Sequence, residues 1–245
     1  MKREVLTDTI FNNTEKPASD FTFNKEVATV FDDMVVRSVP FYLEIQRMVA
    51  ELTKDFARPN TNVYDLGCST GTTMLNLDKV LPMDINFVGV DNSDAMLKKC
   101  EANLKASGVS RKVIYKNQDL NSDIEIHDPS VVIFCLTLQF LRPLKRERLI
   151  KKIHDSLPEN GAIILVEKIL TENSICNRLF IEHYYTFKKR NGYNDIEIAK
   201  KRECLENVLV PYKLSENEEL LKSCGFRFTE VFFKWYNFMG LIAIK

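Results

Sequence analysis

The sequence lacks a hydrophobic run long enough to cross a bilayer. Its longest apolar runs, such as VVIFCL and AIILV, fall far short of the roughly 20 residues that a membrane-spanning helix needs. The start, MKREVLTDTIFNNTEKPASD, also lacks the apolar core of a secretory signal. These absences predict a soluble, cytoplasmic protein that has no membrane partner.

Paired cysteines and an excess of charge are missing too. The six cysteines lie at least 20 residues apart, so none forms the C-x-x-C pair of zinc and redox sites. Thirty-four basic residues balance thirty-four acidic ones, so no long-range field would draw nucleic acid to the surface. We therefore expect reduced thiols and no direct binding of nucleic acid.

Histidine is scarce, with only three in the chain. Their positions give no metal-binding spacing such as H-E-x-x-H, and no Ser-His-Asp or Cys-His arrangement can be assembled from them. We expect no metal cofactor. His127, His154 and His183 are expected to lie on the surface or in the core without a catalytic role.

The sequence does contain a regular alternation of strand-like and helical segments. Short β-rich runs reach residues 67, 91, 117, 136 and 168, and helical segments separate most of them. Such an alternation predicts βαβ units and a parallel sheet covered on both faces by helices. Two more strand-like runs in FRFTEVFFKWYNFMGLIAIK, joined near Lys234, predict a closing antiparallel hairpin. We therefore predict an α/β fold with a doubly wound, mostly parallel seven-stranded sheet.

One domain, residues 20–245, accounts for most of the chain, and the polar residues 1–19 predict a mobile N-terminal arm. Helices are expected at 41–56, from Ser93 to about Ala106 with Ser93 as N-cap, and at 143–156. Residues 168–210 interrupt the alternation with helix-prone, strongly charged sequence before a last helix at 215–223. This helical insertion would lie over the carboxyl edge of the sheet, where open α/β sheets bind ligands.

The first strand runs into a short glycine turn, YDLGCSTG at residues 64–71. A dinucleotide fingerprint needs G-x-G-x-x-G, whose second glycine lets the backbone approach a pyrophosphate. Ser69 takes that place here, and the third glycine is missing. A pyrophosphate would fit this turn poorly. The turn serves either a ligand without phosphate or packing alone.

Acidic and amide side chains follow the next two strands. Asp91 ends the run INFVGVD, where a carboxylate can accept hydrogen bonds from both hydroxyls of a ribose, and Asn92 can orient an adenosine. Asp119 follows the run KVIYKN and is placed to meet an adenine amino group. Together with the glycine turn, these residues favour a nucleoside cofactor over packing alone.

Several segments resemble known enzymes. The order D-x-G-x-S-x-G in the turn resembles the first motif of class I S-adenosylmethionine-dependent methyltransferases. The segments RSVPFY (37–42), KKRNGYNDIEIAKKRECLENVL (188–209) and WYNFMGLIAIK (235–245) resemble the carboxy-S-adenosyl-L-methionine synthase family, and the first two are more specific than the glycine turn. This resemblance covers nearly the whole chain from residue 20 and implies a class I methyltransferase-like Rossmann fold.

The resemblance also implies an activity. The family transfers a carboxyl group from prephenate to the methyl carbon of S-adenosyl-L-methionine and releases phenylpyruvate. A partner enzyme then uses the carboxylated product to modify the wobble uridine of certain tRNAs. In the mechanism proposed for the family, prephenate itself takes the methyl proton, so the enzyme contributes positioning and water exclusion without a nucleophile. A homodimer is implied as well, with the charged insertion as a reasonable dimerisation element.

The family's ligand contacts carry over to particular positions. The resemblance implies contacts at Tyr42, Gly67, Cys68, Ser69, Asp91, Asn92, Asp119, Leu120, Cys135 and Arg202. The family usually has asparagine at the position of Cys135, so only a backbone contact is expected there. Arg202 would pair its planar guanidinium with the added carboxylate, which makes it the predicted catalytic residue.

The residues alone leave some of these roles open. By spacing, Arg202 would be a solvated charge in KKRE and Tyr42 a half-buried helix aromatic, and only the resemblance makes them ligand contacts. Glu167 could orient a cation, face a partner subunit or lie in solvent. Prephenate carries two carboxylates, so more than one cation is expected, with candidates Arg37, Lys200, Lys201 and Arg190.

Two other functions stay open at this stage. A conventional methyltransferase would transfer the methyl group itself. A cofactor-binding protein without catalysis would regulate or scaffold tRNA modification. The basic run RPLKRERLIKK (142–152) could touch tRNA, but its lack of interleaved aromatics and the neutral net charge favour a solvated helix face.

Overall fold

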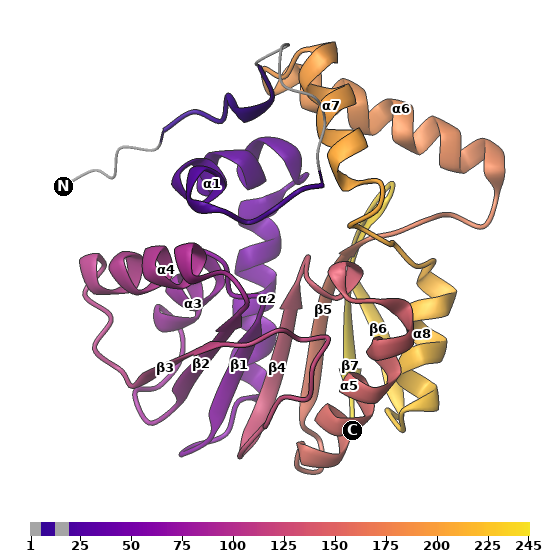
Figure 1. Ribbon diagram of the computed structural model, residues 1–245. Coiled ribbons are helices and arrows are strands. Elements are labelled where there is room, and N and C mark those ends of the chain that lie inside the picture. The colour runs from indigo at the N-terminus through magenta and orange to yellow at the C-terminus, as the bar shows by residue number, and fades with distance from the viewer. Residues whose placement is uncertain (1–5, 13–19) are drawn as a thin grey trace.

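The computed structural model describes residues 6–12 and 20–245, which form a seven-stranded sheet with helices on both faces (Figure 1). The strand order is β3-β2-β1-β4-β5-β7-β6. β1 to β5 run parallel, whereas β7 pairs antiparallel with β5 and β6, which confirms the predicted doubly wound sheet and closing hairpin. The strands are β1 (Asn62–Leu66), β2 (Asn86–Asp91), β3 (Val113–Asn117), β4 (Pro129–Cys135), β5 (Ala162–Lys168), β6 (Phe228–Trp235) and β7 (Phe238–Ile244).

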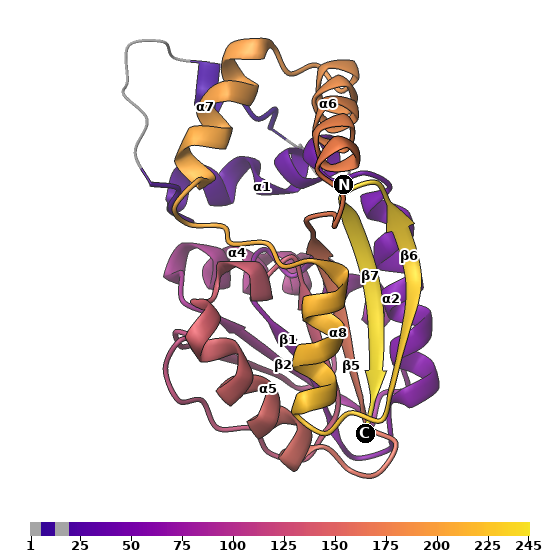
Figure 2. The ribbon, with the colours of Figure 1, turned by 90° about the vertical axis from the view of Figure 1, so that its right-hand side faces the viewer.

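Helices cover the sheet in two groups. α5 and α8 pack on one face, and α2, α3 and α4 pack on the other; Figure 2 shows α8 and α2 on opposite sides of the strands. The α-helices of the described residues are α1 (Lys25–Ser38), α2 (Tyr42–Phe56), α3 (Thr72–Asp78), α4 (Asp94–Ala106), α5 (Pro143–Ser156), α6 (Ser174–Arg190), α7 (Asp195–Leu205) and α8 (Leu214–Ser223).

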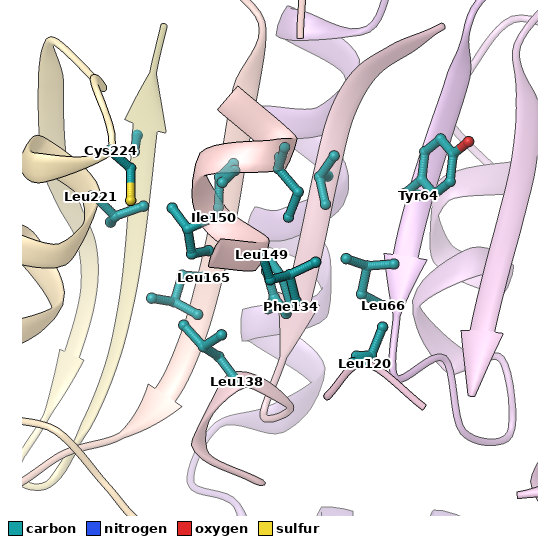
Figure 3. Packing of buried hydrophobic residues seen from close by; sticks show 14 of the residues in the cluster. Tyr64, Leu66, Leu120, Phe134, Leu138, Leu149, Ile150, Leu165, Leu221 and Cys224 are labelled. Carbon is teal, nitrogen blue, oxygen red and sulfur yellow. The ribbon is translucent and has the colours of Figure 1, made fainter. Parts of the chain in front are cut away.

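The central strands are buried on both faces, and their side chains alternate between two cores. In β4, Val132 and Phe134 enter the cluster beneath α5 and α8, and Figure 3 shows Phe134 close to Leu149 of α5. Val131 and Ile133 enter the cluster on the opposite face. The two-residue period of a strand produces this division, and burial of both faces explains why the strand reads as one continuous apolar run.

Local sequence signals set several element boundaries. The hydroxyl of Ser93 accepts a hydrogen bond from the backbone N–H of Met96 at 3.2 Å, so Ser93 caps α4 as predicted. Pro143 occupies the first turn of α5, where its missing N–H costs nothing. The turn between β6 and β7 lies at Tyr236 and Asn237, slightly later than predicted.

Three helices form a layer above the carboxyl ends of the parallel strands: α1, α6 and α7 (Figures 1 and 2). α6 and α7 occupy the predicted insertion at 168–210. The sequence pattern did not indicate α1, which begins after the N-cap Asn24. Together these helices cover the edge of the sheet at which a ligand was expected.

Residues 6–12 lie against this helical layer. Asp8 is buried, and its carboxylate accepts a hydrogen bond from the hydroxyl of Tyr193 at 2.6 Å. Arg37 of α1 donates to the carbonyl oxygen of Asp8 at 3.1 Å. The rest of the predicted arm, residues 1–5 and 13–19, lies outside the described residues, so its mobility stays a prediction. Within the described part of the chain, no helix combines the length and apolarity that a membrane span requires.

Candidate active site

A cavity of about 590 Å³ lies between the helical layer and the carboxyl ends of the strands. Its lining includes residues of α1, α2, α6 and α7, of the ends of β2, β4 and β5, and of the loops after β1 and β3. Open α/β sheets bind ligands at this edge, and the volume is typical of small-molecule sites. The cavity is therefore the candidate active site.

The glycine turn after β1 forms part of the cavity lining. Gly67 and Gly71 have φ angles of 81° and 85°, a region that favours glycine. A methyl group on Gly67 would lie 2.3 Å from the hydroxyl oxygen of Thr137, and one on Gly71 would lie 2.6 Å from Leu104. Backbone conformation and close packing thus require both glycines, so the glycines alone do not identify a ligand.

Asp91 joins this turn to the end of β2. Its two carboxylate oxygens accept backbone hydrogen bonds from Ser69 at 3.0 Å and from Ser93 at 2.9 Å. Burial raises the pKa of the Asp91 carboxyl, and these hydrogen bonds oppose the increase. A carboxylate has about four acceptor sites, so Asp91 keeps capacity for hydroxyl groups of a ligand.

Most of the positions predicted to bind a ligand line this one cavity. They come from α2, the turn after β1, the end of β2, the loop after β3 and the end of β4. The lining positions are Tyr42, Gly67, Cys68, Ser69, Asp91, Asn92, Asp119, Leu120 and Cys135. The fold therefore gathers residues that are far apart in sequence, and their contacts with a ligand stay predictions.

Arg202 is the exception, because its side chain does not line the cavity of its own chain. It is exposed on α7, and a hydrogen bond with Tyr185 raises the pKa of its guanidinium. Its neighbour Lys201 is buried and does line the cavity. Successive helix residues point about 100° apart, so the two side chains cannot share one direction.

Comparison with known proteins identifies the family. The chain is 55% identical over 239 residues to the carboxy-S-adenosyl-L-methionine synthase of Methylococcus capsulatus, across 97% of this chain and 99% of the relative. It is 44% identical over 241 residues to the synthase of Nautilia profundicola, across 98% and 100% of the two chains. The chain belongs to the carboxy-S-adenosyl-L-methionine synthase family. It is accordingly an enzyme, a transferase, as predicted.

Similarity in structure supports the fold of this synthase family. A family model described as a methyltransferase domain matches residues 63–161. A putative S-adenosyl-L-methionine-dependent methyltransferase of Methanococcus maripaludis superposes with a TM-score of 0.61 at 15% identity, across 93% of this chain and 96% of that chain. This likeness confirms the predicted methyltransferase-like fold and says nothing of the substrate.

Cys135 is the position at which the sequence resemblance implied a backbone contact alone. Its sulfur lies 3.3 Å from the side-chain nitrogen of Gln46, which donates a hydrogen bond to it. Burial raises the pKa of the Cys135 thiol, so the sulfur stays protonated at neutral pH. The side chain therefore serves as a neutral, slightly polar part of the wall rather than as a nucleophile.

Asp65, the first residue of the turn motif, is a buried acid behind the glycine turn. Among the described residues, neither of its carboxylate oxygens has a hydrogen-bond partner. Burial raises the pKa of Asp65 to about 7, and the neighbouring charge of Asp91 adds to the increase. Asp65 therefore takes up a proton far more readily than an ordinary aspartate.

Glu167 holds the loop that follows β4. Its carboxylate oxygens accept hydrogen bonds from the backbone N–H groups of Leu138 at 3.0 Å and Gln139 at 2.9 Å. Burial raises its pKa to about 8, and the backbone donors oppose this increase. Gln139 lines the cavity. The structure gives no direct support to any of the roles left open for Glu167. Glu167 instead positions a loop that lines the cavity.

Two lysines extend the site beyond the predicted ligand contacts. Lys201 was one of four candidate cations, and it lines the cavity from α7. Lys168, at the end of β5, also lines the cavity and was missed. The signal for it was present, because Lys168 ends a parallel strand at the same sheet edge as Asp91.

Proposed function

We propose that the protein converts S-adenosyl-L-methionine and prephenate into carboxy-S-adenosyl-L-methionine and phenylpyruvate. The names of the 55% and 44% identical relatives support the carboxylated product. The observation that carries the substrate assignment is the charge of the cavity, which has acids beside β2 and β3 and lysines at β5 and α7. A nucleoside and a small anionic acid suit these two ends.

The acidic end fits the nucleoside part of S-adenosyl-L-methionine. Asp91 would accept hydrogen bonds from the ribose hydroxyls with the lone pairs that Ser69 and Ser93 leave available. Asn92 and Asp119 would contact the adenine. The turn at residues 67–69 would face the amino-acid part, which carries no phosphate and needs no further glycine.

The proposed reaction balances without an outside reagent. Prephenate loses carbon dioxide as its ring becomes aromatic, and its ring hydroxyl leaves as water with a proton from the S-methyl group. The methyl carbon then forms a bond to the carbon dioxide. The positive sulfur of S-adenosyl-L-methionine makes the protons of its methyl group acidic. The products are the carboxylated sulfonium compound, phenylpyruvate and water.

In this reaction the protein would orient the two substrates and exclude water from the cavity. The layer of α1, α6 and α7 lies over the carboxyl ends of the strands (Figure 2), where the cavity lies. This layer would keep carbon dioxide and the deprotonated methyl carbon away from bulk water. Tyr42 is buried on α2 and would hold the ligand from a rigid element. No protein nucleophile takes part.

We propose further that the protein acts as a cytoplasmic homodimer whose product supplies the donor for wobble-uridine (cmo5U34) modification of tRNA. Arg202 would act across the dimer: it is exposed on α7, within the insertion expected to join the subunits, and would reach the partner's cavity. There its guanidinium would pair with the added carboxylate. Direct binding of tRNA is not part of the proposal.

The experiment is incubation of the purified protein with S-adenosyl-L-methionine and prephenate, followed by mass spectrometry of the small molecules. The proposal predicts carboxy-S-adenosyl-L-methionine and phenylpyruvate in equal amounts. S-adenosyl-L-homocysteine together with a methylated acceptor would instead identify a conventional methyltransferase. Tight binding of the nucleoside without any turnover would identify a non-catalytic regulator.

A further inference from the structure

The charged side chains that line the cavity are divided between its two ends. Asp91 ends β2 and Asp119 follows β3, whereas Lys168 ends β5 and Lys201 lies on α7. β2 and β5 are separated by β1 and β4 in the sheet. With neighbouring strands about 4.8 Å apart, the acidic and cationic ends lie roughly 14 Å apart. The cationic end is therefore distinct from the nucleoside end.

Lys201 is buried, and no carboxylate of the described residues forms an ion pair with it. Its ammonium group donates a hydrogen bond to the hydroxyl of Ser38 at 3.1 Å and lies 5.7 Å from the centre of the Tyr193 ring. The Ser38 hydroxyl donates to the Tyr193 hydroxyl at 3.5 Å, which donates to Asp8 at 2.6 Å. Along this chain of hydrogen bonds, the first acid is thus Asp8, two hydrogen bonds beyond Ser38.

Lys168 has still fewer partners. Its ammonium group lies 5.0 Å from the centre of the Tyr184 ring, and Tyr184 itself lines the cavity. Within the described residues, no carboxylate forms an ion pair with Lys168 and its ammonium group makes no hydrogen bond. Burial lowers the pKa of Lys168. The lysine therefore presents an unpaired positive charge to the cavity.

A third lysine, Lys188, lies near the same two tyrosine rings as Lys168 and Lys201. The ammonium group of Lys188 lies 5.7 Å from the Tyr184 ring centre and 5.2 Å from the Tyr193 ring centre. Burial lowers the pKa of Lys188 to about 7, and repulsion from Lys201 and Lys168 adds to the decrease. The charges of Asp8 and Glu197 oppose this decrease, yet neither residue lines the cavity.

Two other candidate cations, Arg37 and Arg190, do not line the cavity. Arg37 forms an ion pair with Asp33 at 3.1 Å and donates to the carbonyl oxygens of Asp8 and Asn191. Arg190 is exposed at the end of α6. Of the cations in the described part of the chain, Lys168 and Lys201 are those that line the cavity.

Buried ammonium groups without anions are costly, and the cost is recovered when an anion binds between them. We propose that Lys168 and Lys201 form a subsite that binds a small dicarboxylic acid, one carboxylate for each ammonium group. This subsite deepens the proposed function, on which it rests only in naming prephenate as the natural dicarboxylate. The two lysines come from different elements, β5 and α7, so they also join the insertion to the sheet through the ligand.

The test is equilibrium binding of two dicarboxylates, prephenate and terephthalate, to the protein saturated with S-adenosyl-L-homocysteine. This nucleoside has no S-methyl group, so no reaction disturbs the measurement. The variants are Lys168→Met and Lys201→Met, which remove the charge but keep an unbranched side chain. The matched control is Lys222→Met, an exposed lysine of α8 that does not line the cavity.

Each subsite variant should bind both dicarboxylates roughly ten- to a hundredfold more weakly, because a hydrogen bond to a charged group is lost. The control should change by less than about twofold, and benzoate, with one carboxylate, should bind the wild-type protein roughly tenfold more weakly than terephthalate. Binding of S-adenosyl-L-homocysteine should change by less than about threefold in every variant, which shows that the variants are folded.

Equal dicarboxylate affinity in the wild-type protein and both lysine variants would overturn the subsite. The outcome is separable from the proposed reaction. If prephenate is not converted but terephthalate binding requires both lysines, the proposed reaction is contradicted and the subsite is supported. If prephenate is converted with an unchanged KM in both variants, the reaction stands and the subsite falls.

Discussion

The ammonium group of Lys201 on α7 donates a hydrogen bond to the hydroxyl of Ser38 on α1, across 3.1 Å. Both residues line the cavity, so this contact joins the insertion to the N-terminal helix directly at the site. Ser38 is the only hydrogen-bond acceptor of this ammonium group among the described residues. The direction of the Lys201 ammonium group is therefore set in part by one hydroxyl.

Ser38→Ala should impair the anionic substrate more than the nucleoside. The alanine leaves Lys201 in place but removes its acceptor, so the ammonium group loses a fixed direction. We expect KM for prephenate to rise by roughly three- to tenfold, with KM for S-adenosyl-L-methionine nearly unchanged. Steady-state kinetics with each substrate varied in turn measures both. Ser38→Thr, which keeps the hydroxyl, should restore most of the loss, and failure of this rescue would argue against a positioning role.

Binding of a dicarboxylate should weaken as pH rises from 6 to 9. Burial lowers the pKa of Lys201 to about 8, while Asp8 opposes the decrease and Arg37 adds to it. Lys188 behind it has a pKa of about 7. Each lysine is charged below its pKa, so the attraction for an anion is lost as pH passes through these two values. Calorimetric titration with terephthalate at several pH values should show this decrease in affinity. In Lys201→Met, the decrease near pH 8 should be absent. A flat profile in the wild-type protein would contradict this account.

Asp65→Asn should change how stability depends on pH. The folded-state pKa of Asp65 is about 7, against an ordinary value of 3.8, so between these pH values the folded protein binds more protons than the unfolded one. Stability from this group is therefore present at low pH and lost as pH rises through 7. An asparagine side chain cannot titrate, so the variant lacks this loss. The free energy of unfolding of the variant minus that of the wild type should therefore rise by up to about 4 kcal/mol between pH 4 and pH 8. Urea unfolding of both ligand-free proteins across that range measures the difference, and a constant difference would show that Asp65 titrates normally.

Arg202 and Asp91 should complement each other between subunits. Arg202→Ala and Asp91→Asn are each expected to be nearly inactive, since one loses the proposed carboxylate partner and the other a ribose acceptor. In a mixed dimer, one of the two cavities would have both residues intact. Random mixing by joint refolding should thus restore about a quarter of wild-type activity. If mixed dimers isolated with two affinity tags stay inactive, Arg202 does not serve the partner's cavity.

The fold was predictable because its signals are local. Continuous apolar runs indicated the buried parallel strands, and strand ends marked Asp91 as a ligand candidate. The position of Lys201 rather than Arg202 toward the cavity was not predictable, since the apolar residues of α7 do not gather on one face. Adjacent basic residues then give no indication of which one points inward.

Arg146 shows a second limit of sequence patterns. It lies in the basic run of α5, which was interpreted as a solvated face, yet its side chain is buried. The guanidinium donates to the backbone carbonyl oxygens of Leu141, Gln139 and Val210. Val210 is 64 residues away in sequence, so this hydrogen bond, which offsets the cost of burying the guanidinium, cannot be foreseen from the local sequence.

The transfer of a carboxyl group is tested most directly with prephenate labelled with carbon-13 in its ring carboxyl group. The label is supplied together with S-adenosyl-L-methionine in buffer that contains excess unlabelled bicarbonate. The account predicts that carboxy-S-adenosyl-L-methionine carries the label and phenylpyruvate does not, because carbon dioxide stays within the covered cavity. An unlabelled carboxylated product, or S-adenosyl-L-homocysteine in its place, would contradict it.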